Sequence, residues 1–541
     1  MSEGAHAETL DSMPSGGGAA ARLSDERRAL LITWGGGALA LLIGILLFTR
    51  FSIEGNLWRD EAIYAYGGQQ LADGVPVYLG IFDPKPPLPT FLTAIGVVGG
   101  RVLGDNRVLM MRAEFFVFAL LAVLAVYWLG LRLWKSPLAA LAGAVTFASF
   151  KGFAMDALPG PDAKTPGIFL AVLSLALLVR RRWFLAALAG SLAFLDWQPL
   201  GIYAAAAVVA AILATDRDET RWKRGARAVG GAAIPLVATV LFLAIAGGLS
   251  QFIEASFTFP ATGLHRGAVT LGGNVDQIVR IVNEHYRDTR VLFWGGLVLL
   301  VVVLGAWLVR ARSSRDRSLP LLPAAVVLGT FAAVAAASVA DFQGYPDLFP
   351  LLPYAAIGIG GAIAVAARRI EGVRLRRVAG GLALAAVVLL AVLSAHWYSA
   401  PEPGLSLPRE QAHANALRRV LNPGERLYVL GDPTPLVLTG LRNPTRYIYL
   451  GSGVDRWAIK HEFGSLEGWE AEIRAVNPPL VVMNLWRTGL GKRMKAWLRS
   501  TYGPGKYLGS WLVFAKPSVR ARARARGIRL CSSCGRSPTS G

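Results

Sequence analysis

Long apolar runs alternate with short polar segments along most of the chain. The first run, 29–49, follows Arg22, Arg27 and Arg28 and is long enough to span a bilayer, for which about 20 residues are needed. No small-residue cleavage site follows this run, so we expect an uncleaved first span with the N-terminus in the cytoplasm. Ten further apolar runs lie at 108–131, 137–155, 164–179, 183–198, 199–214, 228–249, 291–309, 319–340, 347–367 and 378–398.

Basic loops between alternate runs set the expected orientation. Lys and Arg gather in the loops 132–135, 180–182, 217–227, 310–317 and 368–377. Because such loops stay in the cytoplasm, one topology with about eleven spans satisfies all of them. In that topology the run 88–103 cannot be a full span, so we expect a helix that lies along the outer face of the membrane.

The pattern changes after residue 400. Four segments have the composition of short strands, and three amphipathic segments between them are typical of helices. The expected strands are 426–431, 446–451, 480–484 and 507–516, and the expected helices are 409–422, 468–477 and 492–502. Alternating strands and helices indicate a small extracytoplasmic α/β domain. We therefore divide the chain into a disordered cytoplasmic leader (1–28), a membrane domain (29–399) with an outer loop at 50–107, an α/β domain (400–517) and a disordered basic tail (518–541).

Composition supports a membrane protein and argues against nucleic-acid binding. Of the 541 residues 54% are hydrophobic and only 17% are charged, too few to cover a soluble protein of this length. The net charge of +21 is explained first by arginine-rich cytoplasmic loops, and no nucleic-acid-binding motif is present. Cys531 and Cys534 form an isolated CSSC in the basic tail, where we expect neither a metal site nor a redox motif.

Candidate chemistry lies on the outer face, where ionisable groups are costly unless they pair or function. The first outer loop holds the acid pair Asp60 and Glu61 and places Lys85 before two prolines. Taken alone, the acids suit the first turn of a helix and the lysine suits an interfacial anchor. Further outer candidates are Asp156, Asp162, Lys164, His265, Arg266, Asp341, Tyr345 and Asp347. The chain contains no HExxH, Walker, GxSxG or dinucleotide-binding motif.

The order of these motifs along the chain is more diagnostic of a protein family than any single motif. The first span is followed by RDEAIYAYGGQQLADGVPVY, then by DPKPPLPTFLTAIG, then by a span that opens with Arg112, and later by YPDLFPLLPYAAIG. This order resembles the GT-C glycosyltransferases of the protein O-mannosyltransferase and aminoarabinose-transferase type (families 39 and 83). Val77, between Pro76 and Tyr78, is a small departure from their first-loop signature. The resemblance covers most of residues 29–517, and only the first loop is sharply diagnostic.

The resemblance implies a polytopic α-helical membrane protein with the GT-C fold, about eleven transmembrane helices and the small α/β domain. It implies a hexosyl- or pentosyltransferase that moves a sugar from a polyprenyl-phosphate donor to a hydroxyl of a cell-envelope acceptor, with inversion. Asp60 matches the family's general base, with Glu61 beside it. For the family's second acid we prefer Asp162, which immediately precedes the next span, and Asp156 is the alternative. Lys85 matches a residue near the carrier phosphate. Three further residues are candidates for binding the donor phosphate: Tyr345 falls on the tyrosine of a later motif, and His265 and Arg266 are chosen by chemistry alone.

Partners, cofactors and alternatives follow from this assignment. We expect a polyprenyl-phosphate-linked sugar, a glycan, lipid or protein acceptor, membrane lipid as surroundings, and no nucleic acid. Two outer acids are the ligand type that divalent cations prefer, but the resemblance implies no metal requirement, so we expect neither a metal nor a cofactor. The expected location is the plasma membrane. The alternatives are a membrane transporter and a catalytically inactive GT-C-like lipid-binding scaffold.

Overall fold

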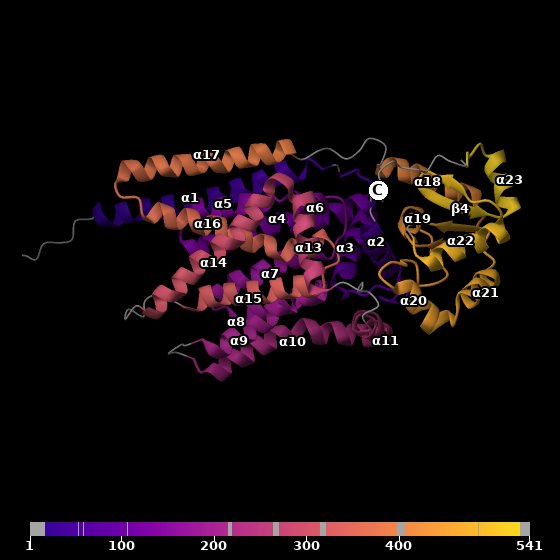
Figure 1. The fold of residues 1–541 in the computed structure, drawn as a ribbon, viewed down its shortest axis with the longest axis horizontal. Helices are drawn as coiled ribbons and strands as arrows, with labels where there is room; N and C mark the ends of the chain where they lie inside the picture. The colour runs from indigo at the N-terminus through magenta and orange to yellow at the C-terminus, as the bar shows by residue number, and fades with distance from the viewer. Residues whose placement is uncertain are drawn as a thin grey trace, which may run out of the picture.

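The computed structural model describes residues 17–51, 53–57, 59–104, 107–214, 219–262, 270–313, 321–397, 406–484 and 486–530. A long bundle of helices carries a small α/β domain at one end, which we call the outer end (Figure 1). The bundle helices are α1 (Gly17–Phe48), α4 (Arg107–Trp134), α5 (Pro137–Ala148), α6 (Lys151–Ala157), α7 (Lys164–Val179), α8 (Trp183–Asp196), η1 (Gln198–Leu200), α9 (Gly201–Leu213), α10 (Arg221–Ala246), α14 (Arg290–Ser313), α15 (Leu321–Ala340), η5 (Tyr345–Leu351), α16 (Leu352–Arg368) and α17 (Val373–Trp397). Shorter elements at the outer end are α2 (Arg59–Ala72), α3 (Leu88–Val102), α11 (Leu249–Ile253), η2 (Glu254–Thr258), α12 (Phe259–Ala261), α13 (Leu271–Ile281), η3 (Val282–Tyr286) and η4 (Arg287–Thr289).

The protein is a multi-pass membrane protein. Within the described residues, seven helices are long and apolar enough to cross a membrane, and the bent pair α5 and α6 makes eight. Three shorter apolar helices, α7, α8 and η1 with α9, occupy the remaining expected positions. Together these elements coincide with the eleven runs of the sequence. The run 137–155 is not continuous, since α5 and α6 meet at 70°.

Two predicted boundaries are wrong. The leader was expected to be disordered up to residue 28, but α1 begins at Gly17. The tail was expected to be disordered from residue 518, but Pro517–Ala525 form helix α23, which buries Val519 and Ala523. Arg522 in α23 donates Nη2 to Glu425 at 2.6 Å and Nε to the carbonyl of Val420 at 2.8 Å. An arginine-rich repeat therefore folds because every fourth position is small or apolar and faces the domain.

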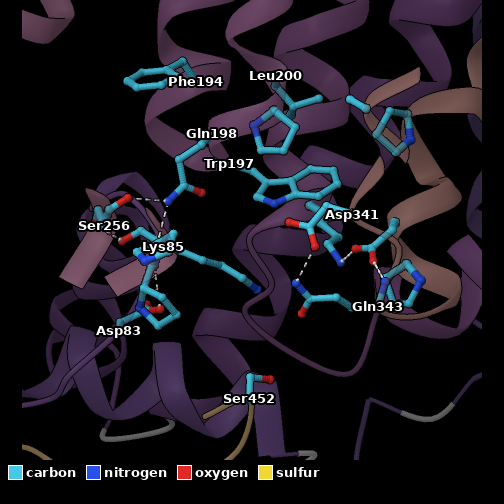
Figure 2. Close-up of a pocket in the computed structure, with 18 of the residues that line it drawn as sticks. Asp83, Lys85, Phe194, Trp197, Gln198, Leu200, Ser256, Asp341, Gln343 and Ser452 are labelled. Carbon is cyan, nitrogen blue, oxygen red and sulfur yellow. Dashed lines mark hydrogen bonds and ion pairs between the residues drawn. The ribbon is translucent and has the colours of Figure 1, made fainter. Parts of the chain in front are cut away.

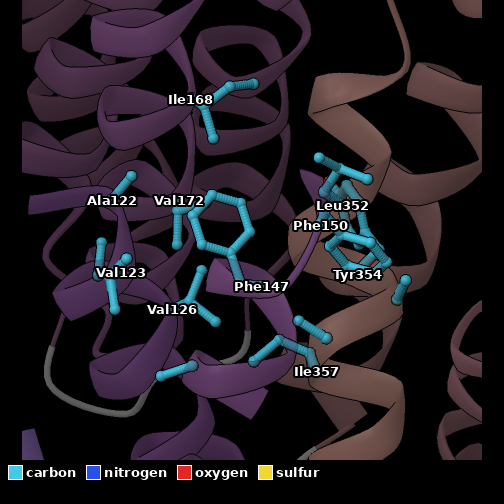
Figure 3. Close-up of a cluster of buried hydrophobic side chains, with 14 of the residues drawn as sticks. Ala122, Val123, Val126, Phe147, Phe150, Ile168, Val172, Leu352, Tyr354 and Ile357 are labelled. Carbon is cyan, nitrogen blue, oxygen red and sulfur yellow. The ribbon is translucent and has the colours of Figure 1, made fainter. Parts of the chain in front are cut away.

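Small residues let the bundle helices pack closely. Figure 3 shows side chains of α4, α5, α7 and α16 meeting in one apolar cluster, with Val126, Phe147, Val172 and Ile357 among the buried residues. In lipid such close packing, rather than the hydrophobic effect, holds spans together. At Gly358 in α16 a Cβ atom would collide with the α14 backbone at Gly296, so this crossing requires glycine.

Segment 88–103 forms helix α3, and its position along the outer face of the membrane stays a prediction. It packs between α2 and α4 at the outer end. A Cβ at Gly68 of α2 would lie 2.7 Å from the Cβ of Thr93, so α2 and α3 meet backbone to backbone. Buried Arg112 of α4 then fixes the start of the loop, since its guanidinium donates to the carbonyls of Ile53, Gly55 (2.8 Å) and Asn56 (3.1 Å).

The α/β domain contains a four-stranded sheet in the order β1-β2-β4-β3. β1 and β2 are parallel, and β4 is antiparallel to both β2 and β3. The strands are β1 (Leu427–Leu430), β2 (Leu480–Met483), β3 (Lys506–Leu508) and β4 (Trp511–Ala515). The helices are α18 (Leu407–Val420), α19 (Thr434–Thr439), α20 (Val454–Ala458), η6 (Ile459–Phe463), α21 (Leu466–Val476), α22 (Gly489–Tyr502) and α23.

Two strand predictions need correction. Segment 507–516 forms the end of one strand and the whole of the next, with Gly509 at positive φ (61°) in the turn. Segment 446–451 is not a strand, although the amide of Gly431 donates to the carbonyl of Ile448 at 2.6 Å. Instead, 446–451 faces the first outer loop: the amide of Phe82 donates to the carbonyl of Arg446 at 2.8 Å, and the Phe82 and Tyr447 rings stack at 5.2 Å. The α/β domain and the first outer loop therefore share one hydrophobic core.

Candidate active site at the outer end of the bundle

A cavity of about 590 Å³ lies between the first outer loop, the outer ends of the spans and the α/β domain. Its membrane end is lined by Phe194, Leu200, Ile202, Val334 and Ala337, which come from α8, η1, α9 and α15. Figure 2 shows Phe194 and Leu200 at one end of the view, Ser452 at the other, and Lys85 and Asp341 between them. The volume lies within the range of about 300–1,000 Å³ that is typical of small-molecule sites. Apolar walls with a few converging polar groups are also typical of such sites.

Helix α2 separates the two acids of the predicted pair. Asp60 is exposed and lines the cavity, together with Tyr64 one turn later on the same face. Glu61 is buried and points elsewhere: a Cβ at Gly160 would lie 2.8 Å from its Cγ, and its charge acts on Arg112. The expected helix opening is confirmed. Of the two acids, only Asp60 is placed to meet a ligand in this cavity.

Lys85 enters the cavity over the ring of Tyr64, with its ammonium 5.3 Å from the ring centroid. Within the described residues no carboxylate forms an ion pair with this ammonium. Burial, reinforced by the charge of Asp83, raises the pKa of Tyr64 well above its usual value, so its hydroxyl stays a neutral donor. Lys85 therefore presents a positive charge that the described protein groups do not neutralise.

Asp83 is buried two residues before Lys85 and also lines the cavity. Its Oδ1 accepts the backbone amide of Lys85 at 3.1 Å, which fixes the turn before the two prolines. Burial raises the pKa of Asp83 to about 6, although the Lys85 charge opposes this shift. Asp83 can therefore exchange a proton near neutral pH.

The backbone around Lys85 is anchored from three sides. Its carbonyl accepts the hydroxyls of Tyr78 (2.8 Å) and Ser256 (3.1 Å). Gln198 Nε2 donates to the carbonyls of Pro84 (2.7 Å) and Ser256 (3.2 Å), which ties η1 to this loop and to η2. These contacts preorganise the position of the lysine before a ligand binds.

A second lysine in the cavity is neutralised by the protein. Lys164 Nζ donates to Asp347 Oδ1 at 2.7 Å, and both side chains are nearly buried. The other oxygen of Asp347 accepts the amides of Gln343 (2.7 Å) and Gly344 (3.1 Å). The ammonium also lies 4.9 Å from the Trp197 ring. This cluster joins the start of α7 to η5 and to the two residues before η5.

Of the other candidate acids, Asp341 and Asp347 line the cavity, whereas Asp156 and Asp162 do not. Asp162 accepts the amides of Lys164 (3.0 Å) and Thr165 (2.9 Å) and so caps α7. Asp156 accepts the hydroxyl of Tyr345 at 2.5 Å. Tyr345 therefore contacts an acid, and its ring stacks on His285 at 4.4 Å. The structure brings Asp156 and Tyr345 together outside the cavity lining, although the charge of Asp60 still acts on the Asp156 carboxyl.

His265 and Arg266 lie outside the described residues. No group of three or more His, Cys, Asp or Glu side chains is placed to hold a metal ion within the part of the chain that the structure describes.

Several cavity residues were not selected as site residues from the sequence. Asp83 could have been found, because it lies beside Lys85 in the same polar loop. Gln198, Ser256, Tyr449 and Ser452 gave no such signal, because only the fold brings their segments to the first loop. These residues line the cavity together with Trp197, Asp341 and Gln343.

Solved structures share this architecture. ArnT from Cupriavidus metallidurans in the apo state superposes with a TM-score of 0.59 at 15% identity, over 92% of this chain and 99% of that one. The same enzyme bound to undecaprenyl phosphate gives 0.56 at 14% identity, over 88% and 97%. An oligosaccharyltransferase from Archaeoglobus fulgidus, in complex with zinc and sulfate, gives 0.52 at 16% identity, over 88% and 72%.

The chain has the GT-C fold. The fold expected from the first loop is confirmed. No protein-family model matches the chain, and no curated protein matches it by sequence.

Proposed function

We propose that the protein is a glycosyltransferase that moves a sugar from a polyprenyl-phosphate donor to a hydroxyl of a cell-envelope acceptor. It acts at the outer face of the plasma membrane, with the N-terminus in the cytoplasm and the α/β domain outside. One observation carries the proposal: Asp60 and Lys85 line one cavity that continues into an apolar end between membrane helices. The fold shared with ArnT bound to undecaprenyl phosphate supports this choice of donor.

The two ends of the cavity suit the two parts of the donor. The polyprenyl chain lies between α8, α9 and α15 at the membrane end, where Phe194, Ile202 and Val334 offer apolar contacts. Its phosphate meets the Lys85 ammonium, because a cation without a protein carboxylate can pair with an anionic ligand. The sugar then lies near Asp60 and Tyr64.

The reaction is a single displacement. Asp60 accepts the proton of the acceptor hydroxyl as that oxygen forms a bond to the anomeric carbon. The bond from the anomeric carbon to the phosphate oxygen breaks, and the electron pair leaves with the polyprenyl phosphate. Lys85 stabilises the charge that develops on the leaving phosphate. Attack opposite the leaving group inverts the anomeric configuration.

The deciding experiment is turnover by purified protein with a panel of polyprenyl-phosphate sugars and crude cell envelope as acceptor source. We expect one donor to release its carrier phosphate and Asp60→Asn to lower the rate by roughly 10²–10⁴-fold, since a positioned base contributes about that much. Thermal unfolding of the variant should match the wild type, because Asp60 is exposed.

Asp73→Asn is the matched control. Asp73 follows α2 in the same loop, pairs with Arg101 and does not line the cavity, so its variant should keep its transfer rate. Equal rates for wild type and Asp60→Asn would refute the role of Asp60. Carrier binding without release from any donor would favour an inactive lipid-binding scaffold.

A further inference from the structure

One wall of the cavity comes from the α/β domain. Tyr449 and Ser452 line the cavity, and both belong to the turn 449–453 that follows the segment packed on the first loop. Ser452 is exposed, and Figure 2 places it at the opposite end of the view from Phe194 and Leu200. The turn 449–453 therefore lies at the end of the cavity away from the spans.

Hydrogen bonds and an ion pair fix the position of the turn relative to the rest of the site. The hydrogen bond from the Phe82 amide to the Arg446 carbonyl joins the segment before the turn to the loop that carries Asp83 and Lys85. The Arg446 guanidinium pairs with Glu254 of η2 at 2.9 Å, and Trp457 Nε1 donates to the same carboxylate at 3.0 Å. The α/β domain is thus connected both to the loop that carries Lys85 and to η2, so the turn has a fixed place in the site.

The turn adopts a backbone conformation that most residues avoid. Ser452 has φ of 48° and Gly453 has φ of 80°, both in the left-handed region. A Cβ at Gly451 would lie 2.5 Å from the Tyr449 hydroxyl oxygen, so a larger residue there would displace the Tyr449 ring. The hydroxyls of Tyr449 and Ser452 lie 3.3 Å apart. Such strain is retained where the surrounding structure imposes it, often at functional sites.

The chemistry of the turn suits an uncharged hydroxyl-rich ligand. It offers two hydroxyls and an aromatic residue and no charged side chain. The other polar groups lining the cavity beyond the lysines include the carboxylates of Asp60 and Asp341 and the amide of Gln343. Carboxylates, amides and hydroxyls are hydrogen-bonding partners for sugar hydroxyls, whereas carboxylates disfavour an anionic ligand.

We propose that the turn 449–453 forms the acceptor subsite, and that this subsite takes a carbohydrate. This inference rests on the proposed function: if the polyprenyl donor occupies the membrane end and Lys85, the acceptor hydroxyl reaches Asp60 from the end where Ser452 lies. The α/β domain is then part of the active site, and Tyr449 and Ser452 determine acceptor specificity.

A labelling experiment tests the subsite without turnover. In a Cys531→Ser, Cys534→Ser background, which removes both cysteines of the chain, Ser452→Cys and Phe194→Cys are treated with N-ethylmaleimide. We expect undecaprenyl phosphate to slow modification of Phe194→Cys and to leave Ser452→Cys unchanged. Protection of Ser452→Cys as strong as that of Phe194→Cys, or no reaction of Ser452→Cys at all, would overturn the inference.

A kinetic experiment tests the acceptor class. With the active donor, methyl glycosides and a serine-threonine peptide are compared as acceptors for wild type, Tyr449→Ala and Ser452→Ala. We expect transfer to a glycoside, with the acceptor KM raised about 10-fold in both variants, as the loss of one or two hydrogen bonds implies, and the donor KM within about 2-fold. Tyr507→Ala and Ser500→Ala change the same residue types elsewhere in the domain and should keep the acceptor KM.

The outcomes separate the two proposals. An unchanged acceptor KM, a raised donor KM, or transfer to the peptide alone would each overturn the acceptor inference while the glycosyltransferase stands. Absence of carrier release by wild type with every donor would instead overturn the proposed function, and the labelling result would still decide whether the turn lies apart from the lipid end.

Discussion

Two regions of the cavity each hold a lysine, and they are organised differently. In the first outer loop, Lys85 lies over Tyr64 and has no carboxylate partner among the described residues. In the helix-end cluster (Lys164, Gln343, Gly344 and Asp347), Lys164 is paired with a buried carboxylate that also accepts two amides. A charge that the protein already neutralises stabilises the fold, whereas a charge that the protein leaves unpaired is available to an anionic ligand. We therefore expect changes in the cluster to affect folding and changes in the loop to affect binding.

The largest effect on stability should come from breaking the helix-end cluster. Asp347→Asn keeps an acceptor for the two amides but leaves the Lys164 charge buried without a partner. Removing one partner of a buried pair costs about 3–5 kcal/mol, so we expect a large fall in the unfolding temperature in detergent. The double variant Lys164→Met, Asp347→Asn removes both charges and should recover much of the loss. A double variant as unstable as the single one would contradict the pairing.

A pH effect on stability should come from Asp83 in the first loop. Its folded pKa of about 6 lies above the ordinary value of 3.8, so folding favours the protonated form. This contribution is complete below pH 3.8 and is lost as the pH rises through 6, by about 3 kcal/mol at most. We expect the difference in unfolding temperature between Asp83→Asn and wild type to grow in favour of the variant from pH 4 to pH 7.

Comparing wild type with Asp83→Asn isolates the contribution of Asp83 to the pH dependence of stability. The comparison is needed because a second group, Glu410, which accepts the amide of Leu57, has a pKa that burial raises to about 7. Parallel curves for wild type and Asp83→Asn across this range would show that Asp83 does not titrate there.

Loss of the Lys85 charge should weaken carrier binding without destabilising the protein. Lys85→Gln removes one charge-assisted contact to phosphate, which is worth about 1.5–3 kcal/mol, or roughly 10–100-fold in Kd. Binding of undecaprenyl phosphate can be followed by the stabilisation it gives to unfolding. Lys492→Gln, an exposed lysine of α22, is the control and should bind as wild type does. Equal affinity in Lys85→Gln would remove Lys85 from the phosphate site.

The smallest effect should come from Tyr345→Phe. The change removes the hydrogen bond to Asp156 and keeps the ring on His285, so we expect a loss of about 1–2 kcal/mol in stability. Tyr345 was predicted to bind the donor phosphate. If it only supports Asp156, the donor KM of the variant should stay within about 2-fold of wild type, whereas a large rise would restore the predicted role.

The first loop could be predicted from the sequence because its parts are close along the chain. Asp60 at a helix start and Lys85 before two prolines are local features, and the apolar runs gave the positions of the spans. The pairing of Lys164 with Asp347 joins residues 183 positions apart, and no local pattern indicates it. The bend between α5 and α6 was also missed, because hydropathy remains high across a break in helix direction.

The roles of the remaining acids required the fold. Asp162 was preferred over Asp156 as the second acid because it immediately precedes the next span, but both lie between the same two apolar runs. In the fold Asp162 caps α7, whereas Asp156 accepts the Tyr345 hydroxyl. Likewise, Tyr449 belongs to a segment expected to be a strand of a separate domain, and Ser452 follows it directly. The packing of this segment on the first loop brings both residues into the cavity.

The core shared by the first outer loop and the α/β domain limits how chimeras of this protein and a related one can be built. Phe82 stacks on Tyr447 and Tyr66 accepts the amide of Asn443, so residues more than 350 positions apart form one unit. A chimera joined only between α17 and α18 would combine a loop from one parent with a domain from another and mismatch these contacts. The exchangeable module consists of the first loop and the C-terminal domain transplanted together.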